Sequence, residues 1–213
     1  MTSGMTASWV VLLALGAFHG INPGMGWLFA VALGMQEGRR SAVLRALLPL
    51  GAGHALAVAA SIGVALAIGA VVPVAWLRWL TAGVLVSLGV LRAFWHRHPR
   101  LVGMRVGMGG LTLWSFLMAT AHGAGLMVVP VFVGMTMTGG GGHMHHMPAT
   151  GAGAGTALVA TGLHALGYLG VTALVAVLVF EKLGVGMLRR AWFNLDLIWA
   201  ATLVATGILT VTL

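Results

Sequence analysis

The segment "FHGINPGMGW" (residues 18–27) decides how we interpret this sequence, because it interrupts a strongly apolar run. "WVVLLALGA" precedes the segment and "LFAVALGM" follows it. Pro23 has no N–H to bond the carbonyl of His19, and the neighbouring glycines weaken a helix further. Irregular backbone at membrane depth is stable only where protein buries it or where it lines a wet cavity. We therefore predict a helix that is broken at Pro23 and Gly24 because it lines a site.

The composition identifies the chain as an integral membrane protein. Of its 213 residues, 60% are hydrophobic and 7% are charged, and the mean hydropathy is +1.03. A soluble domain carries roughly 25% charged residues. A membrane span takes about 20 apolar residues, and the fourth expected span is long enough to bend at Pro130. The expected spans leave no room for a soluble catalytic domain, so we predict an all-α polytopic protein that is not an enzyme. The six expected spans are residues 9–35, 44–69, 73–95, 106–137, 154–181 and 190–212.

The basic residues predict how the protein lies in the bilayer. Of the eleven basic residues, all except Arg78 fall in odd-numbered connections between the expected spans. Because positive charge is retained on the cytoplasmic side, both termini are predicted to lie outside the plasma (inner) membrane. The net charge of +8 then orients the protein in lipid and does not indicate a nucleic-acid partner. The ten residues are Arg39, Arg40, Arg45, Arg92, Arg97, Arg100, Arg105, Lys182, Arg189 and Arg190.

An internal repeat relates the two halves of the chain, 1–98 and 99–213. Three pairs of segments match in the same order, and each unit holds three expected spans. An odd number of spans inverts the second unit relative to the first, as in many transporters, whose sites lie near the midplane. We therefore predict six transmembrane helices arranged as a 3+3 inverted repeat. The pairs are "AFHGINPGMGWLFAVALGM" (17–35) with "ATAHGAGLMVVPVFVGM" (119–135), "GAGHALAVAASIGVALAIG" (51–69) with "ATGLHALGYLGVTALVAVL" (160–178), and "WLTAGVLVSLGVL" (79–91) with "LIWAATLVATGIL" (197–209).

Four histidines fall inside expected spans, one on each of four helices. Ionisable residues inside a membrane are costly and usually functional. Imidazole and thioether groups together suit a fairly soft transition metal. The alternative is that the histidines are hydrogen-bonded core residues and that the methionines fill space in the core. The predicted metal ligands, expected to converge at mid-depth, are His19, Met25, His54, His122, Met127 and His164.

Further polar residues extend the predicted ion path. Asn22 shares a helix face with His19, and Asp196 in "FNLDLIW" is a carboxylate inside a span. Both are candidates for the ion path or for proton coupling, although Asp196 could instead cap its helix near the inner end. The sequence has no cysteine, which excludes thiolate metal sites.

A glycine-rich outer loop, 138–150, contains "TGGGGHMHHMP" (138–148). Short histidine-rich tracts are typical of metal binding, and consecutive glycines make the loop flexible. We predict that this loop captures metal ions outside the membrane. A loop that is merely solvated is the alternative. The candidate ligands are His143, Met144, His145, His146 and Met147.

The motif at the break, followed by "GAGHAL" (51–56), resembles the nickel–cobalt efflux proteins of the RcnA/NicO type in the wider lysine-exporter superfamily. The signature of these proteins is His-x-x-x-Pro-Gly-His in the first span and a histidine in the second, which His19, Pro23, Gly24 and His54 match. Met25 stands where the family has its second motif histidine, which favours a softer ion. The resemblance implies a six-span metal exporter, and it covers about 45 residues of the first half.

These observations predict a membrane transporter of a transition-metal cation, which is copper, nickel, cobalt or zinc. Rocking of the two inverted halves would move the ion past the midplane site. The alternatives are a carrier of a small organic solute with histidine proton relays, a haem protein with bis-histidine ligands, and a membrane enzyme with a histidine-bound metal. The sequence leaves the oligomeric state open.

Overall fold

A computed structural model describes residues 3–94, 107–139, 151–183 and 188–212. Every element in these ranges is helical, which confirms the all-α prediction. The elements are α1 (Ser3–Ile21), the 3-10 turn η1 (Pro23–Met25), α2 (Trp27–Glu37), α3 (Arg40–Gly69), α4 (Val74–Phe94), α5 (Met108–Ala121), α6 (Ala124–Gly139), α7 (Gly151–Leu178), the π-helical turn η2 (Val179–Leu183) and α8 (Leu188–Thr212).

Several of these helices suit a membrane. Among the described residues, three helices are long and apolar enough to cross a bilayer, and a bent pair makes a fourth if it counts as one span. The protein is therefore membrane-embedded, while the six spans and the inverted repeat stay predictions. The three helices are Arg40–Gly69, Val74–Leu91 and Gly153–Lys182, and the pair is Met108–Ala121 with Ala124–Thr136.

The predicted break at Pro23 is confirmed. Helix α1 ends at Ile21, η1 follows, and α2 begins only after Gly26, whose φ of 127° disfavours any residue with a side chain. The side-chain oxygen of Asn22 accepts a hydrogen bond from the Gly24 N–H at 2.9 Å. The Ile21 carbonyl, freed by the break, accepts a bond from the Trp27 indole N–H at 2.9 Å. Local side chains thus satisfy the interrupted backbone.

The bend in the fourth expected span is at Gly123, so the prediction of a bend at Pro130 is wrong. The axes of α5 and α6 meet at 62°, and Gly123 has a φ of 70°. A left-handed residue redirects the chain, whereas a proline only removes one hydrogen bond from a helix. Helix α6 therefore continues through Pro130 to Gly139.

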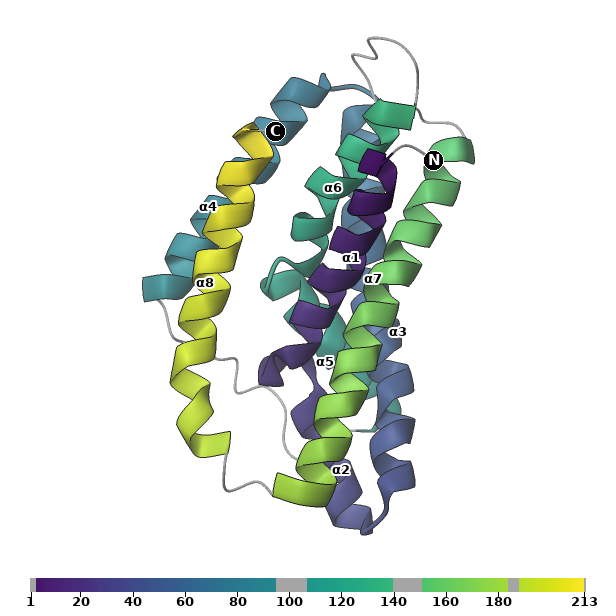
Figure 1. The fold of residues 1–213 in the computed structure, drawn as a ribbon, viewed down its shortest axis with the longest axis vertical. Coiled ribbons are helices and arrows are strands. Elements are labelled where there is room, and N and C mark those ends of the chain that lie inside the picture. The colour runs from purple at the N-terminus through teal and green to yellow at the C-terminus, as the bar shows by residue number, and fades with distance from the viewer. Residues whose placement is uncertain (1–2, 95–106, 140–150, 184–187, 213) are drawn as a thin grey trace.

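Small residues bring the helices together in pairs. A Cβ on Gly16 of α1 would overlap the His164 carbonyl of α7, and a Cβ on Gly53 of α3 would overlap the Thr112 carbonyl of α5. Helices α4 and α8 run side by side (Figure 1), with Gly89 of α4 against α8 and Gly207 of α8 against α4. Close backbone approach at small residues is the usual way in which helices associate in a membrane.

Ion pairs join the ends of α2, α3 and α7. Glu37 contacts Arg39 at 2.5 Å and Arg45 at 2.6 Å, and Arg40 contacts Glu181 at 3.2 Å. These pairs are exposed and contribute little stability. They do bring the basic residues after α2 to the same end of the molecule as the residues that follow α7.

Candidate functional site

Three of the four predicted histidines come together in the core, and we call them the histidine trio. His19 comes from α1, His54 from α3 and His164 from α7. The centre of the His19 ring lies 5.0 Å from that of His164 and 5.6 Å from that of His54, and the last two centres are 5.3 Å apart. All three side chains are fully buried. His54 and His164 lie near the middle of the two longest helices, so the trio is far from the ends of the bundle.

Backbone carbonyls of α1 hold two rings of the trio. Nδ1 of His19 lies 2.6 Å from the Leu15 carbonyl, and Nδ1 of His164 lies 3.2 Å from the Leu12 carbonyl. Since a carbonyl oxygen can only accept, each Nδ1 carries the hydrogen, and Nε2 of the neutral ring bears the lone pair. Histidine ligands of metals are commonly oriented in this way.

His54 is the unusual member of the trio. Within the described part of the chain, neither of its ring nitrogens has a hydrogen-bond partner, and Nε2 of His164 has none either. A buried polar group left without a partner costs about 1–3 kcal/mol. Packing alone therefore gives no reason for a histidine at this position.

Tyr168 holds the His54 ring and also reaches the helix break. Its ring stacks on that of His54 with centres 3.9 Å apart and planes 7° apart. Its hydroxyl donates a hydrogen bond of 2.6 Å to the Met25 carbonyl. Sequence reasoning missed this residue, which is the single tyrosine of the chain. Its position four residues after His164, on the same face of α7, is the signal that could have found it.

His122, the fourth predicted ligand, is placed by other contacts. Its Nδ1 lies 2.8 Å from the Met118 carbonyl, one turn earlier in α5. Its Cε1 lies 3.8 Å from where a Cβ on Gly24 would be, so the ring borders the break in the first span. The helix bends directly after His122, just as the first span breaks soon after His19.

The remaining predicted residues have different surroundings. Met25 and Met127 are buried in one apolar cluster with Tyr168 and Leu203, as space-filling residues would be. Asn22 is nearly buried, and its side chain caps η1. For Asp196 only the backbone, within α8, is described. The predicted outer-loop ligands, His143 to Met147, lie outside the described residues.

The spacing of the trio suits a metal, but its ring orientations do not. Two imidazoles on one tetrahedral ion, with bonds of ~2.1 Å, have their ring centres about 5 Å apart. The planes of His54 and His164, however, are only 9° apart. Among the described residues, no group of three or more His, Cys, Asp or Glu side chains is arranged to hold an ion. Metal binding would therefore require the rings to turn.

Comparisons with protein-family models, curated proteins and solved structures find no match to this chain. The resemblance to nickel–cobalt efflux proteins therefore rests on the motif of the first half, and it stays a prediction.

Proposed function

We propose that this protein transports a transition-metal cation through the membrane and that the histidine trio is its transport site. The observation that carries the proposal is the trio itself. Three fully buried imidazoles from three helices have centres 5.0 to 5.6 Å apart, and two are oriented by carbonyls. The ion is the cargo of this site.

Metal binding requires the His54 ring to turn, and this ring can turn without breaking a hydrogen bond to a described residue. His54 has no hydrogen bond to lose among the described residues, whereas the Nδ1 bonds hold His19 and His164. A modest rotation of His54 away from its stack on Tyr168 would direct a nitrogen toward the centre of the trio. The helices need not move for this step, because the ring spacing is already that of bound imidazoles.

The ligand chemistry favours a soft ion of low charge. The three imidazoles are neutral when they bind metal and do not compensate the charge of the ion. Burial of a charge without compensation is costly, and the cost is smallest for a monovalent ion. Copper in its cuprous form therefore fits this site best, ahead of nickel, cobalt and zinc. Incomplete compensation also favours release, which a transporter requires.

The packing of the helices supports the proposed inverted repeat. The repeat pairs the first span with the fourth and the second with the fifth. A two-fold operation that relates the halves would therefore turn the contact between α1 and α7 into the contact between α5 and α3. Both contacts are present in the structure. Gly89 and Gly207 occupy matching positions in the repeat, and each packs against the helix of the other. A two-fold axis between the halves would produce this reciprocity.

Transport assays on the purified full-length protein test the proposal. Proteoliposomes that enclose a metal-sensitive dye would be given cuprous, nickel, cobalt or zinc ions in separate experiments. We expect uptake of at least one ion, loss of that uptake in His19→Ala, and normal uptake in Thr81→Val. Thr81 is a suitable control because it is a buried polar residue of α4 that bonds its own helix at Leu77.

Two results would contradict the proposal. One is the absence of transport and of bound metal with all four ions, which would favour an organic solute. The other is a Soret band in the purified protein, which would indicate haem.

A further inference from the structure

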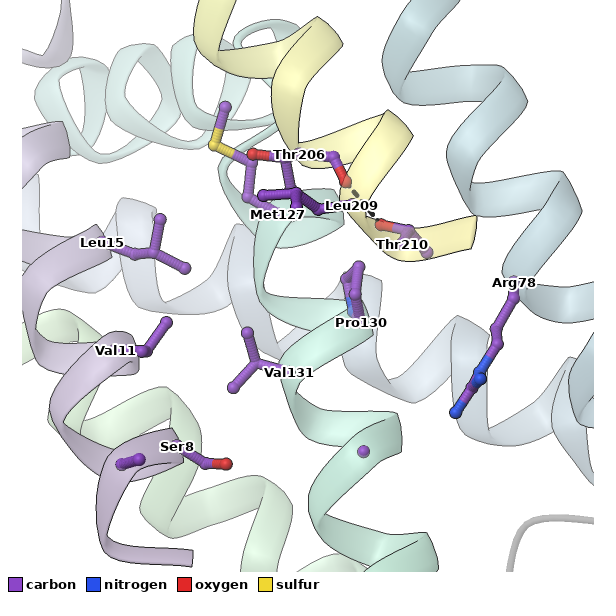
Figure 2. A pocket seen from close by; sticks show the side chains of 12 residues that line it. Ser8, Val11, Leu15, Arg78, Met127, Pro130, Val131, Thr206, Leu209 and Thr210 are labelled. Atoms are coloured by element: carbon purple, nitrogen blue, oxygen red, sulfur yellow. Dashed lines mark hydrogen bonds between the residues drawn. The ribbon is translucent and has the colours of Figure 1, made fainter. Parts of the chain in front are cut away.

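A cavity of about 520 Å³ lies between α1, α4, α6 and α8, apart from the histidine trio. Figure 2 shows that Val11 and Leu15 line it from α1, that Pro130 and Val131 line it from α6, and that Arg78 extends from α4. Small-molecule sites commonly have volumes of ~300–1,000 Å³ and mostly apolar walls with a few polar groups. The cavity has this size and this kind of wall.

Arg78 is the charged group of the cavity. It is the single basic residue outside the clusters that the charge pattern places on the inner side. Among the described residues it has no carboxylate partner, since Glu37 pairs with Arg39 and Arg45 and Glu181 pairs with Arg40. A guanidinium at the end of a membrane span, beside an apolar cavity, is stabilised by a counter-charge.

The two threonine hydroxyls of the wall already donate within α8. Thr206 donates its hydrogen to the Thr202 carbonyl at 2.8 Å, and Thr210 donates to the Thr206 carbonyl at 2.7 Å. Arg78 is the charged donor of the wall and would bind an anion. With one anchoring side chain, binding must also draw on the apolar wall.

The cavity is polar at one end and apolar at the other. Arg78 lies in the second turn of α4, and Thr210 lies in the last turn of the antiparallel α8. Trp76 and Trp79, beside Arg78, are 70% and 63% exposed, as tryptophans of an interfacial belt are. Leu15 and Met127 lie further into the bundle. An elongated ligand with a charged head would match this polarity.

We infer that this cavity binds an amphipathic anion, with a carboxylate or phosphate at Arg78 and an aliphatic chain between Leu15, Met127 and Val131. The ligand comes either from the bilayer, as an anionic lipid, or from solution, as a free amphiphile. This inference goes beyond the proposed function, because Arg78 repels the cations that the histidine trio would carry.

Binding measurements in phosphatidylcholine nanodiscs test the site with two probes. Native mass spectrometry would measure retention of added phosphatidylglycerol, and titration calorimetry would measure binding of decanoate. Arg78→Gln removes the charge, and we expect it to weaken anion binding at least tenfold. Gly134→Leu fills the cavity where a Cβ meets open space, and we expect a similar loss. Arg40→Gln is the matched control, since Arg40 is an exposed arginine paired with Glu181 at the other end.

The two probes distinguish the sources of the ligand. Retained phosphatidylglycerol that decanoate does not displace identifies a lipid site, whereas saturable decanoate binding identifies a site for a free amphiphile. Decanol, which has no charge, should bind the wild type and Arg78→Gln equally. The inference is wrong if neither anion binds above the phosphatidylcholine background. It is also wrong if both Arg78→Gln and Gly134→Leu bind as the wild type does.

Discussion

Replacement of His54 by phenylalanine separates a functional histidine from a packing histidine. His54→Phe keeps an aromatic ring for the stack on Tyr168, whose centre lies 3.9 Å away. It removes two buried nitrogens that have no hydrogen-bond partner among the described residues. If His54 contributes to the fold as a core residue, this substitution should lower the free energy of unfolding. If His54 is kept for ligand binding, the substitution should not lower it.

The expected magnitude follows from these contacts. Relief of a buried unsatisfied polar group is worth about 1–3 kcal/mol, while the slightly larger phenylalanine ring costs about 1 kcal/mol. In the absence of metal, we expect the free energy of unfolding of His54→Phe to be about 1 kcal/mol higher than that of the wild type. His164→Phe is the matched comparison. It loses the Nδ1 bond to Leu12 as well as the unpartnered Nε2, so its stability should change little.

Reversible unfolding in mixed micelles, with and without each metal ion, measures both effects. A ligand at 100 times its dissociation constant stabilises a folded protein by about 2.7 kcal/mol. We expect this shift in the wild type and its loss in His54→Phe. A variant that is more than 1 kcal/mol less stable than the wild type without metal would refute the view of His54 as an unsatisfied core residue. A variant that keeps the full metal shift would exclude His54 as a ligand.

Four further predictions follow from the same structure. His122→Ala should abolish metal transport, whereas joint replacement of His143, His145 and His146 by alanine should only lower the apparent affinity in the proteoliposome assay. Gly26→Ala, at a φ of 127°, should destabilise the fold by about 1–3 kcal/mol in the unfolding assay, whereas Gly63→Ala, at an open position in α3, should not. The hydrogen bond from Arg39 lowers the pKa of Glu37, so its contribution to stability is present near neutral pH and lost on acidification; the melting temperatures of Glu37→Gln and the wild type should converge in acid. Reporter fusions at Gly141 and Leu213 should both report the outer side of the membrane, and a cytoplasmic signal from either would contradict the topology.

Local chemistry made part of this structure predictable. The break at Pro23 follows from a missing N–H, and the apolar character of the long helices follows from composition. The convergence of His19, His54 and His164 was predicted because ionisable residues inside spans are costly and usually functional. Each of these features depends on residue type and spacing, which the sequence contains directly.

Other features depend on contacts between helices, which the sequence does not contain directly. The bend falls at Gly123 and not at Pro130, because a helix can continue past a proline whose free carbonyl is accommodated. Tyr168 was missed because its role comes from a stack on a ring 114 positions earlier in the chain and from a bond to the Met25 carbonyl. The cavity at Arg78 requires four helices to be placed before it exists.

In the proposed inverted repeat, His122 occupies the place in the second unit that His19 has in the first. The repeat exchanges His19 with His122 and His54 with His164, so a two-fold operation turns the trio into His122, His54 and His164. A transporter that alternates between two states would form these two sets in turn.

The hydrogen bonds of the trio fit this exchange. His164 now bonds the carbonyl of Leu12, which lies seven residues before His19. The equivalent carbonyl for His54 belongs to Ser115, seven residues before His122, and Ser115 already packs at Gly53, beside His54. His54, whose nitrogens have no partner among the described residues, would gain the Ser115 carbonyl in the opposite state. Under the proposed repeat, the unsatisfied nitrogens of His54 would be explained if the structure represents one of two exchangeable arrangements.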